Sequence, residues 1–411
     1  MTTQERLHQA ALWSTLASAA AVVVSIAVCQ IFLGLALIAL VASDSPLRLP
    51  PVKLPLLAFL GLTVLSLLAS GHPGAGLPQI RKFFVFTILL AGSSLLLEAR
   101  HARWLAGAWF VAATVSALLS LIQFVQKVEL ARARRQDFYE FYVRERITGF
   151  LSHWMTFSEV GMLVLLVLAS YLFFAPRLSR RAKFLCCLCA GVLLASLIVS
   201  FTRSIWLATA AAGGYLVWQW QKKLLLAAPV ALALALAAAP GAVQKRVRSM
   251  LGARSDTSTS ARFIMWRTGW RMIQAHPLAG VGPERVRAEF PNFLPPDVGE
   301  LPPAFYGHLH NLYIHYAAER GIPAVLALLW LLGRILRDHR RALRHAPEDE
   351  NRFILHAVVA ATIGILLGAM FEVNLGDSEV LTVFLTLVSL GYAMFGALCL
   401  LMSRQDMQPA T

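Results

Sequence analysis

The chain has 411 residues, of which 58% are hydrophobic and only 14% are charged, and its formal net charge is +15. Soluble domains usually carry about 25% charged residues, so this composition excludes an ordinary soluble protein and indicates a chain embedded in a bilayer. No stretch is polar enough to form a separate soluble domain, and we predict one integral membrane domain over residues 1–411. The charge pattern gives no indication of a nucleic-acid partner.

The chain contains apolar runs that recur along its whole length and are long enough to cross a bilayer as helices. These runs are continuously apolar and do not alternate as barrel strands would. We therefore predict an all-α polytopic fold with about 12 transmembrane helices of roughly 20 residues each. Residues 11–43 form either one long tilted helix or a tight pair. The expected spans are 11–27, 28–43, 53–70, 80–97, 103–125, 158–175, 182–200, 203–220, 223–241, 310–334, 352–374 and 379–402.

Lys and Arg residues in the short loops predict the orientation of the chain, because cytoplasmic loops are enriched in them. Four short loops share one side under this span assignment, and both termini join them there. Arg81 and Lys82 do not fit this orientation, since they fall on the opposite side. The basic residues of the four loops are Arg100 and Arg103; Arg177, Arg180, Arg181 and Lys183; Lys222 and Lys223; and Arg334, Arg337, Arg340, Arg341, Arg344 and Arg352.

Two long loops, 126–157 and 242–309, fall on the extracytoplasmic side and are rich in Arg and aromatic residues. Long loops cross the membrane largely regardless of their charge, so these arginines do not contradict the orientation. They indicate either contact with anionic lipid head groups or a site that handles phosphate.

Five cysteines lie in apolar runs and none in a long polar loop, so we predict buried membrane thiols and no disulfide framework. The group at 186–189 lacks the spacing of a metal site. The cysteines are Cys29, Cys186, Cys187, Cys189 and Cys399.

Arg203 lies between two apolar runs with almost no connecting loop, on the extracytoplasmic side. A cation this close to hydrocarbon is costly unless it is paired or faces a polar cavity. The alternative is a side chain that extends to the membrane surface with no further role.

Residues 258–273 predict an amphipathic helix, with Ser258 or Ser260 as its cap and an end before Pro277. Its apolar stripe is expected to consist of Phe263, Trp266, Trp270 and Ile273, with arginines on the other face. Such a helix suits a membrane interface, where it is either a lid or part of a site. Arg262 lies near its start, where backbone N–H groups favour anions.

A histidine-rich segment, His308-Leu309-His310-Asn311 with His315 further on, begins the next apolar run. The histidine spacing does not match the i, i+4 pairing of a helix, and no carboxylate lies close in the sequence, so we predict no metal. His310 acting as a base, or orienting a hydroxyl, fits better. A hydrogen-bonded histidine at the interface without chemistry is the alternative.

Together these segments resemble the O-antigen ligase and O-antigen polymerase superfamily. The resemblance is sharpest over about 200–325, in SARFIMWRTGWRMIQAHPLAGVGPE followed by HNLYIHYAAERGIPA. The family pattern of Arg-x-x-x-Trp, Pro-x-x-Gly-x-Gly and His-Asn with a later Gly corresponds here to Arg262, Trp266, Pro277, Gly280, Gly282, His310, Asn311 and Gly321.

The resemblance implies a metal-independent, inverting glycosyltransferase with a GT-C-like architecture, no cofactor, and amphipathic helices in a large periplasmic loop. It implies an O-antigen ligase of the bacterial inner membrane, which transfers O-antigen polysaccharide from undecaprenyl pyrophosphate to a lipid A-core sugar at the periplasmic face. Arg203 and Arg262 would bind the pyrophosphate, and His310 would be catalytic. Arg144 and Arg146 would contact phosphates of donor or acceptor, although an ordinary surface ion pair with Glu145 is the alternative.

An O-antigen polymerase and a protein O-oligosaccharyltransferase are the nearest rivals, since they use the same kind of donor. The basic outer loops favour an acceptor with many phosphates, as lipid A-core has. A transporter of lipid-linked glycans is the rival from another class, but the sequence shows no repeated halves and few intramembrane acidic residues.

Overall fold

The computed structural model describes residues 1–175, 178–239, 241–251, 257–302, 304–347 and 351–405. Within these ranges every regular element is a helix, which confirms the all-α prediction. The elements are α1 (Thr3–Ala21), α2 (Ile26–Ala42), α3 (Lys53–Ala69), α4 (Pro73–Arg81), α5 (Phe83–Leu95), α6 (Ala99–Ala133), α7 (Phe138–Arg144), α8 (Trp154–Phe174), α9 (Arg180–Val199), α10 (Arg203–Trp220), α11 (Leu224–Ala238), α12 (Gly241–Leu251), α13 (Thr257–Ala275), α14 (Val286–Glu289), η1 (Phe290–Phe293), α15 (Leu312–Arg320), α16 (Ile322–His345), α17 (Arg352–Gly368), η2 (Asn374–Gly376) and α18 (Ser378–Gln405).

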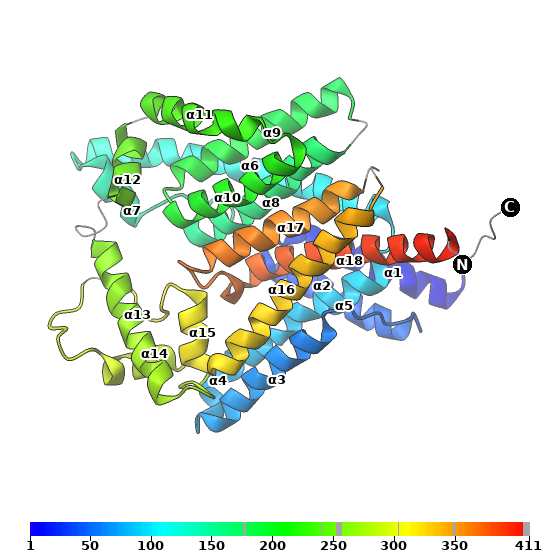
Figure 1. The fold of residues 1–411 in the computed structure, drawn as a ribbon, viewed down its shortest axis with the longest axis horizontal. Coiled ribbons are helices and arrows are strands. Elements are labelled where there is room, and N and C mark those ends of the chain that lie inside the picture. Colours follow the sequence, from blue (N-terminus) through cyan, green and yellow to red (C-terminus); the bar gives the residue numbers. More distant parts are fainter. Residues whose placement is uncertain (176–177, 240, 252–256, 303, 348–350, 406–411) are drawn as a thin grey trace.

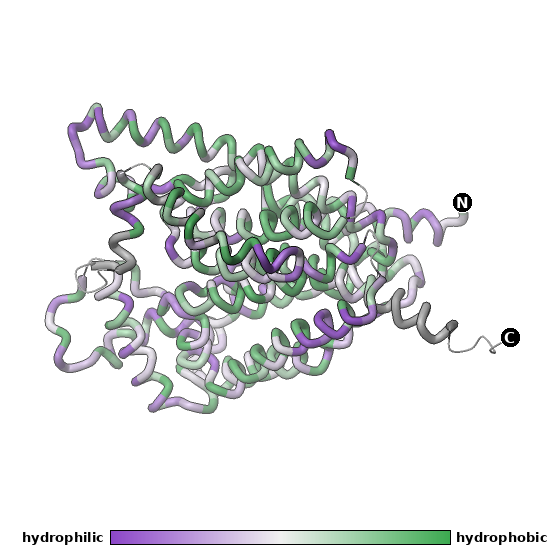
Figure 2. The backbone as a smooth tube through the Cα atoms, turned by 45° about the horizontal axis from the view of Figure 1, so that its top comes forward, coloured by the Kyte–Doolittle hydropathy of each residue, from purple (hydrophilic) through white to green (hydrophobic). Residues whose placement is uncertain are grey.

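The outer surface of the helix bundle is apolar, as expected for a helical membrane protein. Among the described residues, four helical stretches are long and apolar enough to cross a membrane: Pro73–Leu95, Ala99–Ala133, Trp154–Phe174 and Arg180–Val199. Large side chains such as Ile38, Val111 and Phe184 are each more than 60% exposed, and a soluble protein rarely exposes apolar surface on this scale. Hydrophobic residues make up most of the bundle, and hydrophilic residues gather at its ends (Figure 2). The protein is therefore a helical membrane protein.

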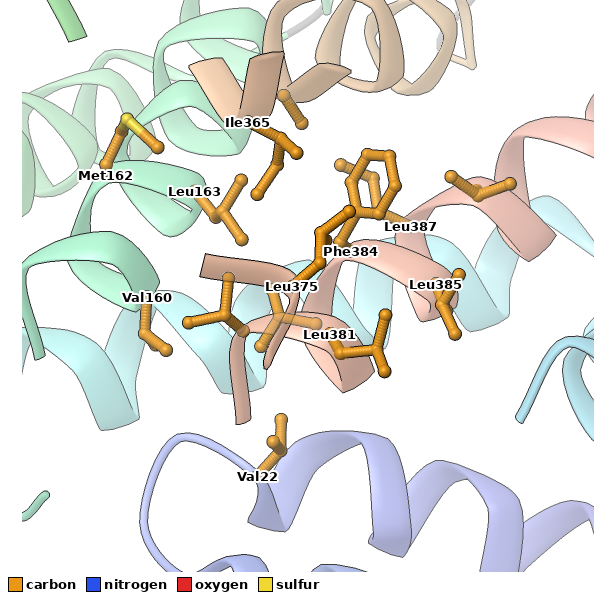
Figure 3. Close-up of a cluster of buried hydrophobic side chains, with 14 of the residues drawn as sticks. Val22, Val160, Met162, Leu163, Ile365, Leu375, Leu381, Phe384, Leu385 and Leu387 are labelled. Carbon is orange, nitrogen blue, oxygen red and sulfur yellow. The ribbon is translucent and has the colours of Figure 1, made fainter. Parts of the chain in front are cut away.

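The centre of the bundle is built where α8, α17 and α18 meet. Figure 3 shows Met162 and Leu163 of α8, Ile365 of α17 and Phe384 of α18 converging there with Leu375 of η2. All five side chains are buried. This core fixes the ends of α8, α17 and α18, and the site lies just beyond those ends.

Most of the expected spans coincide with a helix, although several bounds differ and the membrane crossings stay predictions. Residues 11–43 form the tight pair α1 and α2, one of the two predicted arrangements, and Ser25 caps α2 through its side chain. The single span predicted for 310–334 is wrong: the chain breaks at Gly321, whose φ of 87° favours glycine. The short helix α15 ends there, and α16 begins at the next residue.

The two ends of the helix bundle are built from different elements (Figure 1). The N-terminus and the end of α18 lie at one end, while α4, α13, α14 and α15 gather at the other. The predicted loop 126–157 is shorter than expected, since α6 continues to Ala133 before α7 begins. The span count of about 12, the GT-C likeness and the sidedness stay predictions.

Candidate functional site

The glycines of the sequence motif hold the turn 277–282 against the break between α15 and α16. Val281 N donates to Ala318 O at 2.8 Å, Gly282 N to Glu319 O at 2.9 Å, and Ile322 N to Pro277 O at 2.9 Å. A Cβ on Gly280 would overlap the backbone of Glu319, and Gly280 also has a positive φ of 66°. These motif positions are therefore required by close backbone packing, and they do not contribute chemical groups.

Asn311 and the start of α15 are tied to the end of α17. The Asn311 side chain caps α15 by accepting from Ile314 N at 3.0 Å, and its amide donates to Met370 O at 2.9 Å. Leu312 N donates to Ala369 O at 2.8 Å. The segment that carries His310 is thereby fixed against the segment that carries Glu372.

His310 lies between this cap and a tryptophan of the other motif. Trp266 of α13 donates from Nε1 to the carbonyl of Leu309 at 3.0 Å. His310 itself has a φ of 46°, a left-handed conformation that is unfavourable for a residue with a Cβ. Strained backbone of this kind persists where the surrounding structure enforces it, and it is concentrated at functional sites.

Glu372 joins two of the predicted site residues. Its carboxylate accepts from Arg262 Nη2 at 2.9 Å and lies 3.0 Å from His310 Nδ1. The Glu372 side chain is 6% exposed, whereas the side chains of Arg262 and His310 are each 23% exposed. A buried carboxylate behind a partly exposed imidazole orients the ring and stabilises its protonated form.

The electrostatics of this group keep Glu372 ionised. Burial alone would raise the pKa of the carboxyl, but the hydrogen bond and charge of His310, together with Arg262, lower it below its ordinary value. His308 differs, because burial and the neighbouring His310 lower its pKa to about 3. His308 is thus neutral across the physiological range.

Arg262 belongs to a larger group of guanidinium side chains, here named the arginine cluster. Its members are Arg146, Arg203, Arg246 and Arg262. Burial and the charges of Arg246, Arg262 and Arg203 lower the pKa of Arg146 to about 9, which still leaves it charged at neutral pH. Several like charges held close together favour the binding of an anion with more than one charge.

The arginine cluster is assembled from four separate segments. Arg203 opens α10 immediately after a break at Phe201, whose φ is 55°. Arg246 of α12 is 5% exposed, and its Nε donates to the carbonyl of Phe201 at 3.0 Å. Arg146 donates from Nε to Val143 O at 3.2 Å. The sequence analysis predicted Arg146, Arg203 and Arg262, but not Arg246.

Arg144 does not join the cluster. It is exposed and lies at the end of α7, beside a shallow depression lined by Arg134, Asp137 and Glu140. The ion pair considered between Glu145 and its neighbouring arginines is also absent from the described contacts, since Glu145 pairs with Lys127 at 2.7 Å. The structure therefore separates the two arginines that the sequence had grouped.

The prediction that α13 carries its aromatic residues on one face and its arginines on the other is wrong for Arg267 and Arg271. Met265, Thr268 and Met272 face the protein, while Phe263 and Trp270 are 55% and 57% exposed. The exposed aromatic residues lie on the same face as Arg267 and Arg271, where they line a shallow groove with Pro295 and Pro296. A helix with small and sulfur-containing residues on its packed side can leave its aromatic rings outside, which the apolar stripe alone does not reveal.

The prediction that no carboxylate lies close to the histidines is also wrong, because a carboxylate distant in the sequence lies beside them in the fold. Ligand atoms of His308, His310 and Glu372 lie within 4.8 Å of one another, close enough to share a metal ion. Two histidines and a glutamate form a ligand set that zinc uses in proteins. However, the Arg262 guanidinium already contacts Glu372 at 2.9 Å and would repel a cation at this position.

Comparison with known protein families identifies the segment that contains much of this site. Residues 188–329 match the family model described as O-antigen ligase. This match confirms the resemblance stated above and covers Arg203, Arg246, Arg262 and His310. A search of curated proteins finds no match.

Proposed function

We propose that this chain, a membrane protein of the O-antigen ligase and polymerase superfamily, is an O-antigen ligase. It would transfer O-antigen polysaccharide from undecaprenyl pyrophosphate to a sugar of lipid A-core, with inversion at the anomeric carbon, at the periplasmic face of the inner membrane. The arginine cluster beside the His310–Glu372 pair is the observation that carries the proposal. It combines a site for a polyanionic leaving group with a base.

The arginine cluster serves the leaving group. When the glycosidic bond to the pyrophosphate breaks, negative charge grows on the departing phosphate oxygens. Guanidinium groups held in place before the reaction stabilise this charge without reorganisation. They also bind phosphate oxygens through paired hydrogen bonds. Arg203 and Arg262 are the members expected to contact the pyrophosphate directly.

His310 serves the acceptor. Its ring is fixed through Nδ1 by Glu372, which leaves the second ring nitrogen to take the proton of the attacking hydroxyl. The imidazolium formed in this step is stabilised by the buried carboxylate. Glu372 is therefore a positioning residue for His310, and its contact with Arg262 links the base to the leaving-group site.

The proposed reaction needs no metal, because Arg262 supplies positive charge at the carboxylate that a cation would use. Treatment of the purified protein with a chelator should leave transfer intact. Loss of transfer that is restored by added zinc or magnesium would replace this mechanism with one in which His308, His310 and Glu372 hold an ion.

The lipopolysaccharide of a strain that lacks this chain distinguishes a ligase from a polymerase. A ligase-null strain should make core-only lipid A and accumulate long polymer on undecaprenyl pyrophosphate. Core that carries a single repeat unit would indicate a polymerase instead. Normal lipopolysaccharide with glycans missing from proteins would indicate a protein O-oligosaccharyltransferase.

A further inference from the structure

A polar cavity of about 270 Å³ adjoins the site at Glu372 and His308. Its walls come from α4, the start of α8, the turn around Glu284, the segment 305–308, α15 and the segment 372–377. Ligand pockets in proteins start at about 300 Å³, so this cavity has the size of one small polar group such as a sugar ring. We name it the carboxyl cavity.

Five carboxyl groups contribute to its lining. They are those of Glu159, Glu284, Glu319, Glu372 and Asp377. Lys82 is the one Lys or Arg among the described lining residues, and no member of the arginine cluster is among them. Lys82 did not fit the predicted orientation, and its role is local, since its Nζ donates to Gly376 O at 3.0 Å. The cavity and the arginine cluster differ in charge although both border Glu372.

Most of these carboxyl groups are already satisfied by the protein. Glu319 pairs with Arg320 at 2.9 Å and accepts from Glu284 N at 2.9 Å. Glu284 accepts from Gln79, and Glu372 is bound by Arg262 and His310. These groups belong to the scaffold or to the reaction described above.

Glu159 is the exception. It is 0% exposed, it lines the cavity, and neither of its side-chain oxygens has a hydrogen-bond partner among the residues that the structure describes. A buried polar group without a partner costs free energy of folding, so a ligand that hydrogen-bonds to Glu159 would recover this cost. His315, also on the cavity wall, has an unpartnered Nδ1. Both groups point to a ligand rich in hydrogen-bonding groups.

Asp377 adds a second acceptor beside Glu159. Thr156 donates to one of its oxygens at 2.7 Å, and no ion pair of Asp377 occurs among the described residues. Two aromatic residues, Tyr316 and Phe305, also line the cavity. Acidic oxygens combined with aromatic faces suit a sugar ring, whose hydroxyl groups donate hydrogen bonds while its C–H faces pack on the rings.

We propose that the carboxyl cavity binds the accepting sugar, through hydroxyl groups that donate to Glu159 and Asp377, and that it selects a sugar without phosphate or carboxylate groups. This inference rests on the proposed function. Inverting displacement requires the hydroxyl to attack the anomeric carbon from the side opposite the departing pyrophosphate. Separate binding regions of opposite charge meet this requirement. An anionic sugar would not find in this cavity the group of guanidinium donors that the arginine cluster offers.

The test is a kinetic comparison of Glu159→Gln and Asp377→Asn with the wild-type protein in lipid nanodiscs. Donor and acceptor are the lipid-linked polymer and the core-only lipid A that a null strain accumulates. The KM for acceptor should rise about tenfold in each variant, because an amide NH2, which cannot accept a hydrogen bond, replaces a carboxyl oxygen. The KM for donor should stay within about twofold. Glu300→Gln, an exposed carboxyl outside the cavity, is the matched control and should behave as wild type.

A rise in the donor KM with the acceptor KM unchanged would overturn the inference, as would unchanged values for both variants. Failure of the wild-type protein to transfer polymer would contradict the proposed function separately. In that case binding is measured directly with delipidated core oligosaccharide, whose Kd should rise about tenfold in Glu159→Gln. Equal Kd values for wild type and variant would then reject the cavity as a sugar site. Unaltered binding of inorganic pyrophosphate verifies that each variant is folded.

Discussion

The arginine cluster and the carboxyl cavity both adjoin Glu372. They differ in the ionisable side chains that line them and in how those side chains are paired. The cluster is a set of guanidinium groups in which burial, together with the charges of its neighbours, lowers the pKa of Arg146. The cavity has five carboxyl groups in its lining, of which Glu159 has no hydrogen-bond partner within the described part of the chain. One region therefore favours an anion with several charges, and the other favours a neutral ligand with many hydroxyl groups.

Under the proposed function, this difference separates the two substrates. A phosphate group in the carboxyl cavity would lack the guanidinium donors of the arginine cluster, and a neutral sugar in the cluster would not supply the charge that guanidinium groups bind. The His310–Glu372 pair lies where the two regions adjoin, so a hydroxyl held in the cavity would reach the base there. A substitution in one region should then change the KM for one substrate and leave the KM for the other unchanged.

The largest effect is expected for His310→Ala and for Arg262→Ala. Each should lower the rate of transfer by about a hundredfold or more, because a base or a fixed charge that acts in the transition state is lost. The rate is measured with lipid-linked polymer and core-only lipid A in nanodiscs. Arg262→Lys separates charge from geometry, since it retains the charge but not the paired donors. Wild-type rates in both alanine variants would remove these residues from the reaction.

A somewhat smaller effect is expected for Glu372→Gln, which should lower transfer by tens of times or more, as for carboxylates that orient a catalytic histidine. The pKa of Glu372 lies below its ordinary value of 4.5. The interactions that lower it favour the folded site above that pH and are lost as the pH falls through the lowered pKa. Wild-type activity should therefore stay level from pH 8 to about pH 5 with respect to this group. An acid limb for Glu372 above pH 5 would contradict the assignment.

An intermediate effect is expected for Asn311→Ala, which removes the cap of α15 and the bond to Met370. Loss of such a cap costs about 1 kcal/mol of stability, and His310 should shift relative to Glu372. We expect a lower thermal midpoint and a decrease in kcat of several times, with substrate affinities unchanged. Asn311→Asp retains the cap oxygen and should restore most of the midpoint. A change in donor KM alone would be inconsistent with a scaffold role.

The smallest effect distinguishes Arg144 from Arg146. Arg144→Ala should leave transfer within about twofold of wild type, as is usual for an exposed side chain away from the site. Arg146→Ala should weaken donor binding by about tenfold, since a charge-assisted contact is lost. The donor KM reports both changes. Equal losses in the two variants would show that the exposed arginine also contacts substrate and that the cluster is larger than described.

The sequence allowed the prediction of Arg203, Arg262 and His310 because each lies beside a recognisable boundary. Arg203 interrupts an apolar run, Arg262 lies near the start of a helix, and His310 precedes a cap residue. Such signals are local. They identify the elements and their ends, and the all-helical membrane fold follows from the same kind of information.

Glu372 could not be predicted in this way, because it lies 62 residues from His310 in the chain and inside the expected span 352–374. α17 ends early, at Gly368, which frees the following segment to turn back toward α15. The break at Gly321 and the packed face of α13 were missed for a related reason. Both depend on contacts between distant segments, namely the turn 277–282 against α15 and Trp266 against Leu309.

The most direct test of the central claim is the affinity for undecaprenyl pyrophosphate, measured without acceptor on the wild-type protein and on the double variant Arg203→Ala/Arg262→Ala. The account predicts that the Kd rises by about a hundredfold, since two charge-assisted contacts to phosphate are lost. Glu159→Gln should keep the wild-type value in the same assay. A double variant that binds undecaprenyl pyrophosphate as tightly as wild type would contradict the assignment of the arginine cluster to the leaving group.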